Sequence, residues 1–359
     1  MLITGGEFYA AISVLNSVLL IFSIDISDFF LWFVLFETSI VTTLSTLTVE
    51  GRSVRRIWAL LAMLLVAFLG SVATVSALTI SQRNSNGGFS ESSVATKWAL
   101  IAIVSLAVVV KIPLFPGSFW LPEAHVEASW PGSVALAGYA LKFATVSIVT
   151  FFGTGFLITC DILWVVALIS VMFGTISLGS SNDSKKLIAN LSIVHMSATF
   201  LLLVSVISGY VAFAIDFSWH HHSIITGILF VLVGIVYAST GSRLFRFLLG
   251  NPLQIPVFGA LWFALFTFSL DLPWTSNVAV ELGVFVVAIS SASWIFSSLV
   301  LLLWLVIIAV LSTGFRGNGN AGKIFSDLTT FWCAIAIVAA VGVVVIGFCT
   351  VGCNLFIGF

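Results

Sequence analysis

Residues 111–142 read KIPLFPGSFWLPEAHVEASWPGSVALAGYALK and lie between two long apolar runs. The stretch begins at Lys111 and ends at Lys142, and it contains four prolines, two glutamates and one histidine. A proline inside a helix removes a backbone hydrogen bond, and at membrane depth the freed carbonyls need protein partners or a hydrated cavity. The stretch therefore predicts a helix that is broken between Pro113 and Pro122, next to a functional site inside a membrane.

The composition of the whole chain places it in a lipid bilayer. Of its 359 residues, 60% are hydrophobic and only 8% are charged, and the mean hydropathy is +1.22. Apolar runs of about 20 residues, the length at which a helix crosses the hydrocarbon core, recur from end to end. We therefore predict an all-α polytopic membrane protein with a single transmembrane domain, residues 1–359. The net charge of -1 leaves no basic surface for nucleic acid.

About eleven membrane-spanning helices are predicted. Two of them are expected to be discontinuous, one near Pro113–Pro122 and one near Pro273, because prolines interrupt otherwise apolar runs. The predicted spans cover residues 8–24, 29–49, 57–80, 97–111, 132–153, 156–179, 187–214, 219–240, 257–289, 295–314 and 327–359.

Basic residues in the loops predict the orientation. Nine lysines and arginines fall on the side of the N-terminus, and only Arg83 and Lys97 fall on the opposite side. Loops that face the cytoplasm or the matrix carry the excess of basic residues, so the N-terminus is predicted to face that compartment. The nine are Arg52, Arg55, Arg56, Lys185, Lys186, Arg243, Arg246, Arg316 and Lys323.

Four ionisable residues are predicted at membrane depth: Lys111, Lys142, Glu37 in FFLWFVLFETSIVTTL and Glu281 in LPWTSNVAVELGVFVVAI. Each such charge costs about 3 kcal/mol near the bilayer centre, so it needs a partner, water or a use. Static ion pairs are one alternative, but replacing buried pairs with apolar residues is often neutral or stabilising. Alternating carboxylates and lysines that are joined by water pass protons, so we predict a proton relay. No nucleotide fingerprint competes with it, and the four cysteines lack the partners of a metal site.

Histidines supply further candidates. His195, in LIANLSIVHMSATF, and at least one of the triplet His220–His222 can bridge the lysines and Glu281, because imidazole both donates and accepts a proton. A packed, hydrogen-bonded histidine is an equal alternative on the residues alone. The triplet does not chelate one metal ion from a single helix face, because successive residues point about 100° apart. His125 lies in the break region, where loop or water contacts are the simpler explanation.

Several motifs follow one another along the chain. The central run carries P-x-x-P, WLPEAHVEA and GSV-x-LAG-x-x-LK, and other segments add LFE at Glu37, DSKKLIANLSIVHM at 183–196, GILFVLVGIVY after the triplet and LP-x-x-x-N-x-x-x-E at 272–281. In this order they resemble subunit 4 of mitochondrial NADH:ubiquinone oxidoreductase, respiratory complex I, a member of the antiporter-like family. The form WLPEAHVEA is typical of subunit 4 rather than of the related subunits 2 and 5.

The resemblance implies site residues. In that family a glutamate and lysine pair, a central lysine and a distal glutamate or lysine carry proton translocation. By motif position these four residues are Glu37, Lys111, Lys142 and Glu281. His195 and, less directly, His222 match family histidines on the path towards the distal glutamate, which favours the relay over the packed histidine.

The resemblance also implies a fold, a location and partners. The fold is an antiporter-like helix bundle, with its core at about residues 29–290 and C-terminal helices at about 295–359. The chain is expected in the inner mitochondrial membrane, with its N-terminus in the matrix, where it couples NADH:ubiquinone electron transfer to proton pumping. Its partners are other membrane-arm subunits of complex I, including neighbouring antiporter-like subunits, and membrane lipids. No cofactor is implied in this chain, because flavin, iron–sulfur clusters and ubiquinone belong to partner subunits.

The chain departs from the family pattern in three places. The usual P-F-H is PGS at residues 116–118, and the usual A-P-T is ASW at residues 128–130. Both changes concern the expected hydration of the loop, and they leave the four buried charges in place. Only one predicted span precedes the helix of Glu37, where the family has four, so three helices are expected to be missing or supplied by a separate chain.

Two other functions stay open at this point. A free-standing or Mrp-type Na⁺/H⁺ antiporter subunit would use the same four charges, and isolation without flavin and iron–sulfur subunits would favour it. An architectural membrane subunit without an active relay is the second alternative. Loss of one of the four charges would mark that case, and none is lost.

Overall fold

The computed structural model describes residues 28–48, 53–85, 94–142, 144–145, 161–205, 209–244 and 256–269, with a few residues between 11 and 22. Within these ranges the chain is helical, apart from turns and one isolated antiparallel bridge between Asp183 and Leu244. The helices are α2 (Phe29–Thr48), α3 (Val54–Ser85), α4 (Val94–Lys111), α5 (Trp120–Glu127), α6 (Trp130–Ala135), α8 (Asp161–Gly179), α9 (Ser184–Ser205), α10 (Gly209–Thr240) and α12 (Pro256–Phe268). A 3₁₀ turn, η1 (Gly117–Phe119), precedes α5, and a π-helical turn, η2 (Leu136–Ala140), follows α6.

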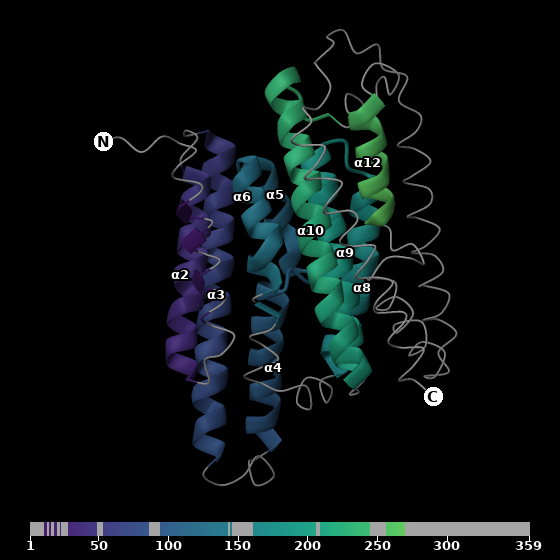
Figure 1. The fold of residues 1–359 in the computed structure, drawn as a ribbon. Coiled ribbons are helices and arrows are strands. Elements are labelled where there is room, and N and C mark those ends of the chain that lie inside the picture. Colours follow the sequence, from purple (N-terminus) through teal and green to yellow (C-terminus); the bar gives the residue numbers. More distant parts are fainter. Residues whose placement is uncertain are drawn as a thin grey trace.

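The helices run roughly side by side along one axis (Figure 1). α2, α3 and α4 form one side of this bundle, α8, α9, α10 and α12 form the other, and the shorter α5 and α6 lie between them. α9 packs against α8, α10 and α5, and nearly all of its residues from Ser184 to Val204 are buried. Gly174 of α8 allows close approach, since an added Cβ would lie 2.9 Å from Cγ2 of Val194 on α9. Small residues at helix contacts are typical of membrane bundles.

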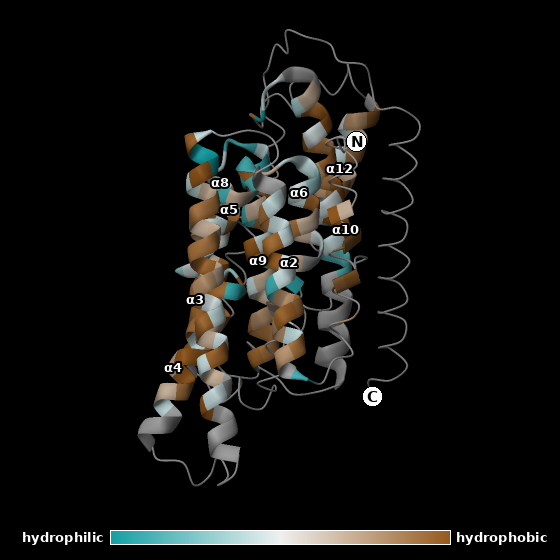
Figure 2. Cartoon of the chain, turned by 90° about the vertical axis from the view of Figure 1, so that its left-hand side faces the viewer, coloured by the Kyte–Doolittle hydropathy of each residue, from teal (hydrophilic) through white to brown (hydrophobic). Residues whose placement is uncertain are grey.

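Four helices in the described part of the chain are long and apolar enough to cross a membrane: Val54–Ala77, Ile162–Gly179, Ser184–Val204 and His220–Ala238. Shorter apolar helices occupy Phe30–Ser45, Trp98–Lys111 and Val257–Phe268. Figure 2 shows hydrophobic colour along α3 and α4, and hydrophilic colour near the end of the bundle where α8 and α5 are labelled. Large apolar side chains such as Trp58, Leu65 and Phe68 are exposed on α3, as a lipid-facing helix requires.

One pair of predicted spans is corrected by the structure. The sequence predicts spans at 187–214 and 219–240, whereas α9 ends at Ser205 and α10 begins at Gly209. The segment VISGYVAFAI is apolar on both sides of the boundary, so hydropathy places no break there. The prediction of about eleven spans stays a prediction. Residues 270–359, with the expected break at Pro273, the helices at 295–359 and Glu281, lie outside the described residues.

The chain between α4 and α5 turns instead of continuing the helix. The amide of Leu114 donates to the carbonyl of Val109 at 3.1 Å, and the amide of Phe115 donates to Ser170 Oγ of α8 at 2.7 Å. Gly117 then lies so close to α4 that an added Cβ would be 2.6 Å from the oxygen of Val109. Only glycine fits at this approach, which gives the departure of Gly117 from the family pattern a steric reason.

Candidate functional site

Glu37 and Lys111, from α2 and α4, form an ion pair inside the bundle. Lys111 Nζ lies 3.2 Å from Glu37 Oε1, and Ser71 Oγ of α3 donates to the same oxygen at 2.5 Å. The lysine side chain is 4% exposed and the glutamate side chain 29% exposed. The ammonium group also lies 3.9 Å from the ring centroid of Phe36, a cation–π contact. The two residues that the sequence places far apart are therefore direct partners.

The backbone around Lys111 suits a cation. Lys111 is the last residue of α4, where the helix dipole places partial negative charge. Gly70 of α3 leaves room for its alkyl chain, because an added Cβ would lie 2.9 Å from Lys111 Cγ and 3.1 Å from Cε. Neither Ser71 nor Gly70 was identified from the sequence, since each is an ordinary residue of an apolar helix.

We expect Gly70→Ala to displace Lys111 and weaken its pairing with Glu37. The added methyl group overlaps the alkyl chain of Lys111, so the ammonium group has to move. Overpacking at such a close contact costs about 1–3 kcal/mol, so the thermal transition of the purified protein should fall. The matched control is Val72→Ile, which adds one carbon on the exposed side of the same helix and should leave the thermal transition unchanged. An unchanged transition for Gly70→Ala would show that the contact with Lys111 is not a tight one.

Lys142 follows the π-helical turn η2 and points back at it. Its Nζ donates to the carbonyl of Ala137, and Ser223 Oγ of α10 donates to the carbonyl of Gly138 at 2.7 Å. A π turn shifts the helix hydrogen bonds by one residue and frees carbonyls that side chains can then bind, and such turns often mark functional sites. Among the described residues, no carboxylate lies within ion-pair distance of Lys142, although the side chain is buried. Lys142 is therefore held by carbonyl dipoles rather than by a counter-charge.

Two of the predicted histidines lie together. The ring centroids of His195 on α9 and His222 on α10 are 5.3 Å apart, and both residues are buried. Ser223, the residue after His222, donates to the carbonyl of Gly138 in the π turn before Lys142, so the helix that carries His222 contacts this turn. His221 turns towards α12, where its Nε2 lies 3.1 Å from the carbonyl of Phe268, while His220 is exposed. The triplet thus points in different directions, as the helical period requires.

A cavity of about 50 Å³ separates Lys111 from the helix that carries Lys142. Lys111 lines it from one side, and Ala140, Leu141 and Ala144 line it from the other. The volume is enough for a few water molecules, which need about 10–15 Å³ each. Most of the other walls are apolar, so water is best held beside the ammonium group of Lys111. The described structure therefore brings Lys111 and the Lys142 segment to the same small space.

Residues 26–311 match the protein family described as NADH:quinone oxidoreductase/Mrp antiporter, TM. The chain belongs to this family. It is similar to NADH-ubiquinone oxidoreductase chain 4 of Prototheca wickerhamii, 30% identical over 308 residues, which are 80% of this chain and 57% of that protein. The corresponding protein of Arabidopsis thaliana is 29% identical over 289 residues, 76% of this chain and 57% of the relative. The chain spans about 57% of the length of these curated relatives.

Solved structures of the antiporter family have the same fold. A chain of respiratory complex I from Thermus thermophilus with bound NADH aligns with a TM-score of 0.78 at 22% identity, covering 96% of this chain and 77% of that one. A chain of the Mrp complex from Dietzia sp. DQ12-45-1b aligns with a TM-score of 0.78 at 16% identity, covering 98% and 80%. The family resemblance predicted from the motifs is confirmed, and so is the antiporter-like helical membrane fold.

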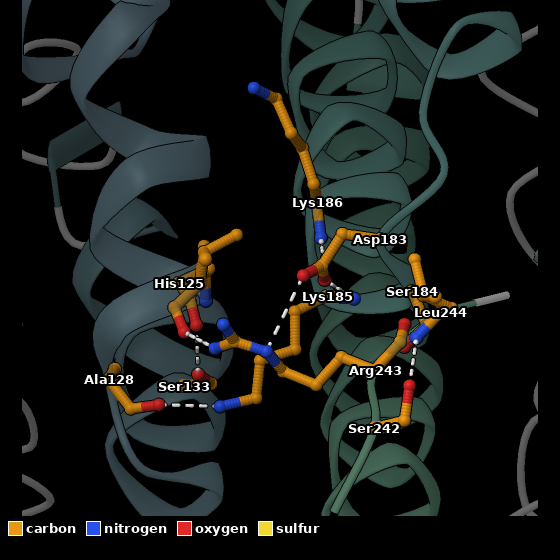
Figure 3. A network of polar contacts seen from close by, with 11 residues as sticks. His125, Ala128, Ser133, Asp183, Ser184, Lys185, Lys186, Ser242, Arg243 and Leu244 are labelled. Atoms are coloured by element: carbon orange, nitrogen blue, oxygen red, sulfur yellow. Dashed lines mark hydrogen bonds and ion pairs between the residues drawn. The ribbon is translucent and has the colours of Figure 1, made fainter. Parts of the chain in front are cut away.

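A second polar network of this antiporter-family chain holds the C-terminal end of α5 (Figure 3). Lys185 Nζ of α9 donates to the carbonyl of Ala128 at 2.5 Å, and Arg243, just after α10, donates to the carbonyl of Val126. Arg243 also pairs with Asp183 at 3.4 Å. We call Lys185, Arg243 and Asp183 the α5 clamp. The lysine and the arginine bind carbonyls at the C-terminal end of α5, and Asp183 pairs with the arginine.

The sequence interpretation missed this clamp. It counted Lys185 as a loop charge, whereas the side chain is buried and the residue is 4% exposed. A signal was present in Asp183, whose Oδ1 accepts from the backbone amides of Lys185 and Lys186 at 2.9 and 3.3 Å and so begins α9. A cap at that position puts the next residues on the helix instead of in a loop. Within the described residues, no group of three or more His, Cys, Asp and Glu side chains is arranged to hold a metal ion.

Proposed function

We propose that this chain is the proton-translocating, antiporter-like membrane subunit of respiratory complex I, an NADH:ubiquinone oxidoreductase. The proposal rests chiefly on the buried ion pair of Lys111 with Glu37. Lys111 lines a small cavity that is also lined by Leu141, the residue before a second buried lysine, Lys142. Membership of the antiporter family and similarity to proteins named NADH-ubiquinone oxidoreductase chain 4 support it. We place the chain in the inner mitochondrial membrane as a multi-pass subunit with its N-terminus in the matrix, because the basic loops favour that orientation.

The proposed mechanism moves protons along a row of buried groups. A change of protonation that arrives beside Glu37 weakens its hold on Lys111, and the proton of Lys111 shifts across the cavity towards Lys142. From there the charge passes through His195 and His222 towards Glu281, which lies outside the described residues. A lysine suits this task because its proton is released when its electrostatic surroundings change.

The rest of the machinery is assigned to partner subunits. The chain holds no redox group in this proposal, and flavin, iron–sulfur clusters and ubiquinone act in other subunits of the complex. Its neighbours in this proposal are other membrane-arm subunits, including antiporter-like ones, together with membrane lipids. We propose that α4 and α5 are two halves of one discontinuous membrane span and that about eleven spans complete the bundle.

A second candidate is a subunit of an Mrp-type Na⁺/H⁺ antiporter. The similarity to a chain of an Mrp complex, with a TM-score of 0.78, favours it specifically. A mass-spectrometric inventory of the purified assembly separates the two. Flavin and iron–sulfur subunits in the assembly support complex I, and their consistent absence supports the antiporter. The third alternative, an architectural subunit, predicts normal coupling when the buried charges are neutralised.

Neutralising Glu37 tests the proposal. We expect Glu37→Gln to lower the number of protons pumped per electron by tenfold or more, on the scale of about 10²–10⁴ that positioned proton-transfer groups contribute. The amide still accepts from Ser71 but no longer attracts the Lys111 proton. The control is Asp28→Asn, the same change on an exposed residue whose Oδ1 accepts from the amide of Leu31 at the start of α2. Proton uptake by proteoliposomes that carry the whole complex measures both, and normal pumping by Glu37→Gln would refute the mechanism.

A further inference from the structure

His125 of α5 is a buried ionisable side chain that the proposed relay does not use. Its residue is 0% exposed, and neither ring nitrogen has a hydrogen-bond partner among the described residues. Its ring stacks on Phe230 of α10, with centroids 4.5 Å apart and an angle of 10° between the planes. The sequence interpretation gave loop or water contacts as the simpler explanation at this position, and the structure places the side chain in the interior of the bundle.

Packing alone does not explain a histidine at this position. A buried polar atom without a partner is destabilising, so in a native protein its presence needs a specific explanation, for example a catalytic role. The stack on Phe230 uses the flat face of the ring, which a phenylalanine would supply without burying two unpaired nitrogens. The two nitrogens are what distinguishes imidazole, since one accepts a proton while the other releases one.

The surroundings of His125 connect it to the relay. Lys185 of the α5 clamp and Lys142 are both near enough to act electrostatically on the ring. Its own carbonyl accepts from Ser133 Oγ of α6 at 3.2 Å, which ties α5 to the helix that leads to Lys142. Figure 3 shows His125 and Ser133 beside the clamp cations, at the junction between α5 and α6. The ring is thus fixed near that junction, within electrostatic reach of Lys142.

We propose that His125 is a further relay residue that passes protons between the α5–α6 junction and Lys142. The neutral ring takes up a proton at one nitrogen and releases the proton of the other nitrogen towards Lys142, so each transfer leaves a neutral imidazole. Stacking on Phe230 keeps the ring plane fixed, and the clamp holds the end of α5 in place. This inference rests on the proposed function and adds to it a second path by which protons reach Lys142.

Two substitutions separate a relay role from a structural one. His125→Phe keeps the stack on Phe230 and removes both nitrogens, and His125→Gln keeps polarity without the ability to exchange protons between two ring atoms. In the complex reconstituted into proteoliposomes, we expect both variants to assemble normally and to pump about tenfold fewer protons per electron. The control is His220→Phe, the same change at an exposed position of α10, which should pump normally.

Each outcome decides the question. Wild-type pumping by either assembled variant overturns the inference, and failure of both variants to assemble assigns His125 a structural role and overturns it as well. Lys142→Ala is measured in parallel to separate this result from the proposed function. If Lys142→Ala stops pumping while His125→Phe pumps normally, only the role of His125 is wrong. If Lys142→Ala pumps normally, the relay itself is wrong.

Discussion

Replacing Lys142 with alanine should abolish proton pumping and leave the complex assembled. In the proposed relay, Lys142 is the central step between Lys111 and the histidine pair. The loss should be a factor of about 100 or more, on the scale of positioned proton-transfer groups. Assembly should survive because Lys142 bonds to a backbone carbonyl and not to a buried carboxylate that would be left uncompensated.

Lys142→Arg separates charge from proton exchange. Arginine keeps the positive charge but does not release its proton in proteins, so a relay should fail even though the electrostatics are similar. If the positive charge alone matters, Lys142→Arg should pump normally. The control is Lys186→Ala, where an exposed lysine pairs with Glu123 at 3.4 Å and contributes little. Pumping is measured as the pH change in proteoliposomes during NADH oxidation, and intact pumping by Lys142→Ala would contradict the proposed mechanism.

The buried charges could be predicted from the sequence because they are rare. A lysine or glutamate in an apolar run stands out against its neighbours, and the cost of burying it points to a use. Glu37, Lys111 and Lys142 were found in this way, and the structure brings the first two to 3.2 Å. The bounds of α2 and the C-terminal end of α8 also followed closely from hydropathy, since polar segments flank α2 and follow α8.

Other parts of the site could not be predicted, because their signals depend on three-dimensional contact. Ser71 is one of many serines in apolar helices, and only the fold places it beside Glu37. The π turn before Lys142 has no sequence pattern that separates it from an ordinary helix. His125 was placed in a loop because the prolines around it suggested one, whereas α5 is a short helix packed between longer ones. Local patterns locate charges, and packing decides which groups surround them.

The segment that departs from the family pattern at residues 128–130 depends on a glycine far along the chain. Ser129 begins α6, and its Oγ accepts from the amide of Gly132 at 3.3 Å. Trp130 then packs onto Gly234 of α10 so closely that an added Cβ would lie 2.6 Å from both Cβ and Cγ of the tryptophan. Carbon atoms in normal contact are about 3.5–4.0 Å apart, so any side chain at Gly234 must push α6 and α10 apart by about 1 Å.

We therefore expect Gly234→Ala to destabilise the bundle and to impair the relay together. Overpacking of this kind costs about 1–3 kcal/mol, which should lower the thermal transition of the purified complex and its yield. A shift of α6 also moves η2 and Lys142 away from α10, where Ser223 binds the π turn. Thermal unfolding followed by native gel electrophoresis measures the first effect, and proton pumping measures the second.

A compensating substitution tests whether the contact with Trp130 is the cause. Trp130→Gly removes the three atoms that lie nearest to the new methyl group, so the double variant Gly234→Ala, Trp130→Gly should recover most of the stability. Glycine at the start of α6 costs up to about 1 kcal/mol by itself, so recovery is expected to be partial. A coupling energy between the two sites that is close to zero would show that they act independently, and the predicted contact would then be wrong. A matched control is Gly227→Ala on the same helix, where an added Cβ would be 3.7 Å from Val134 and fits without strain.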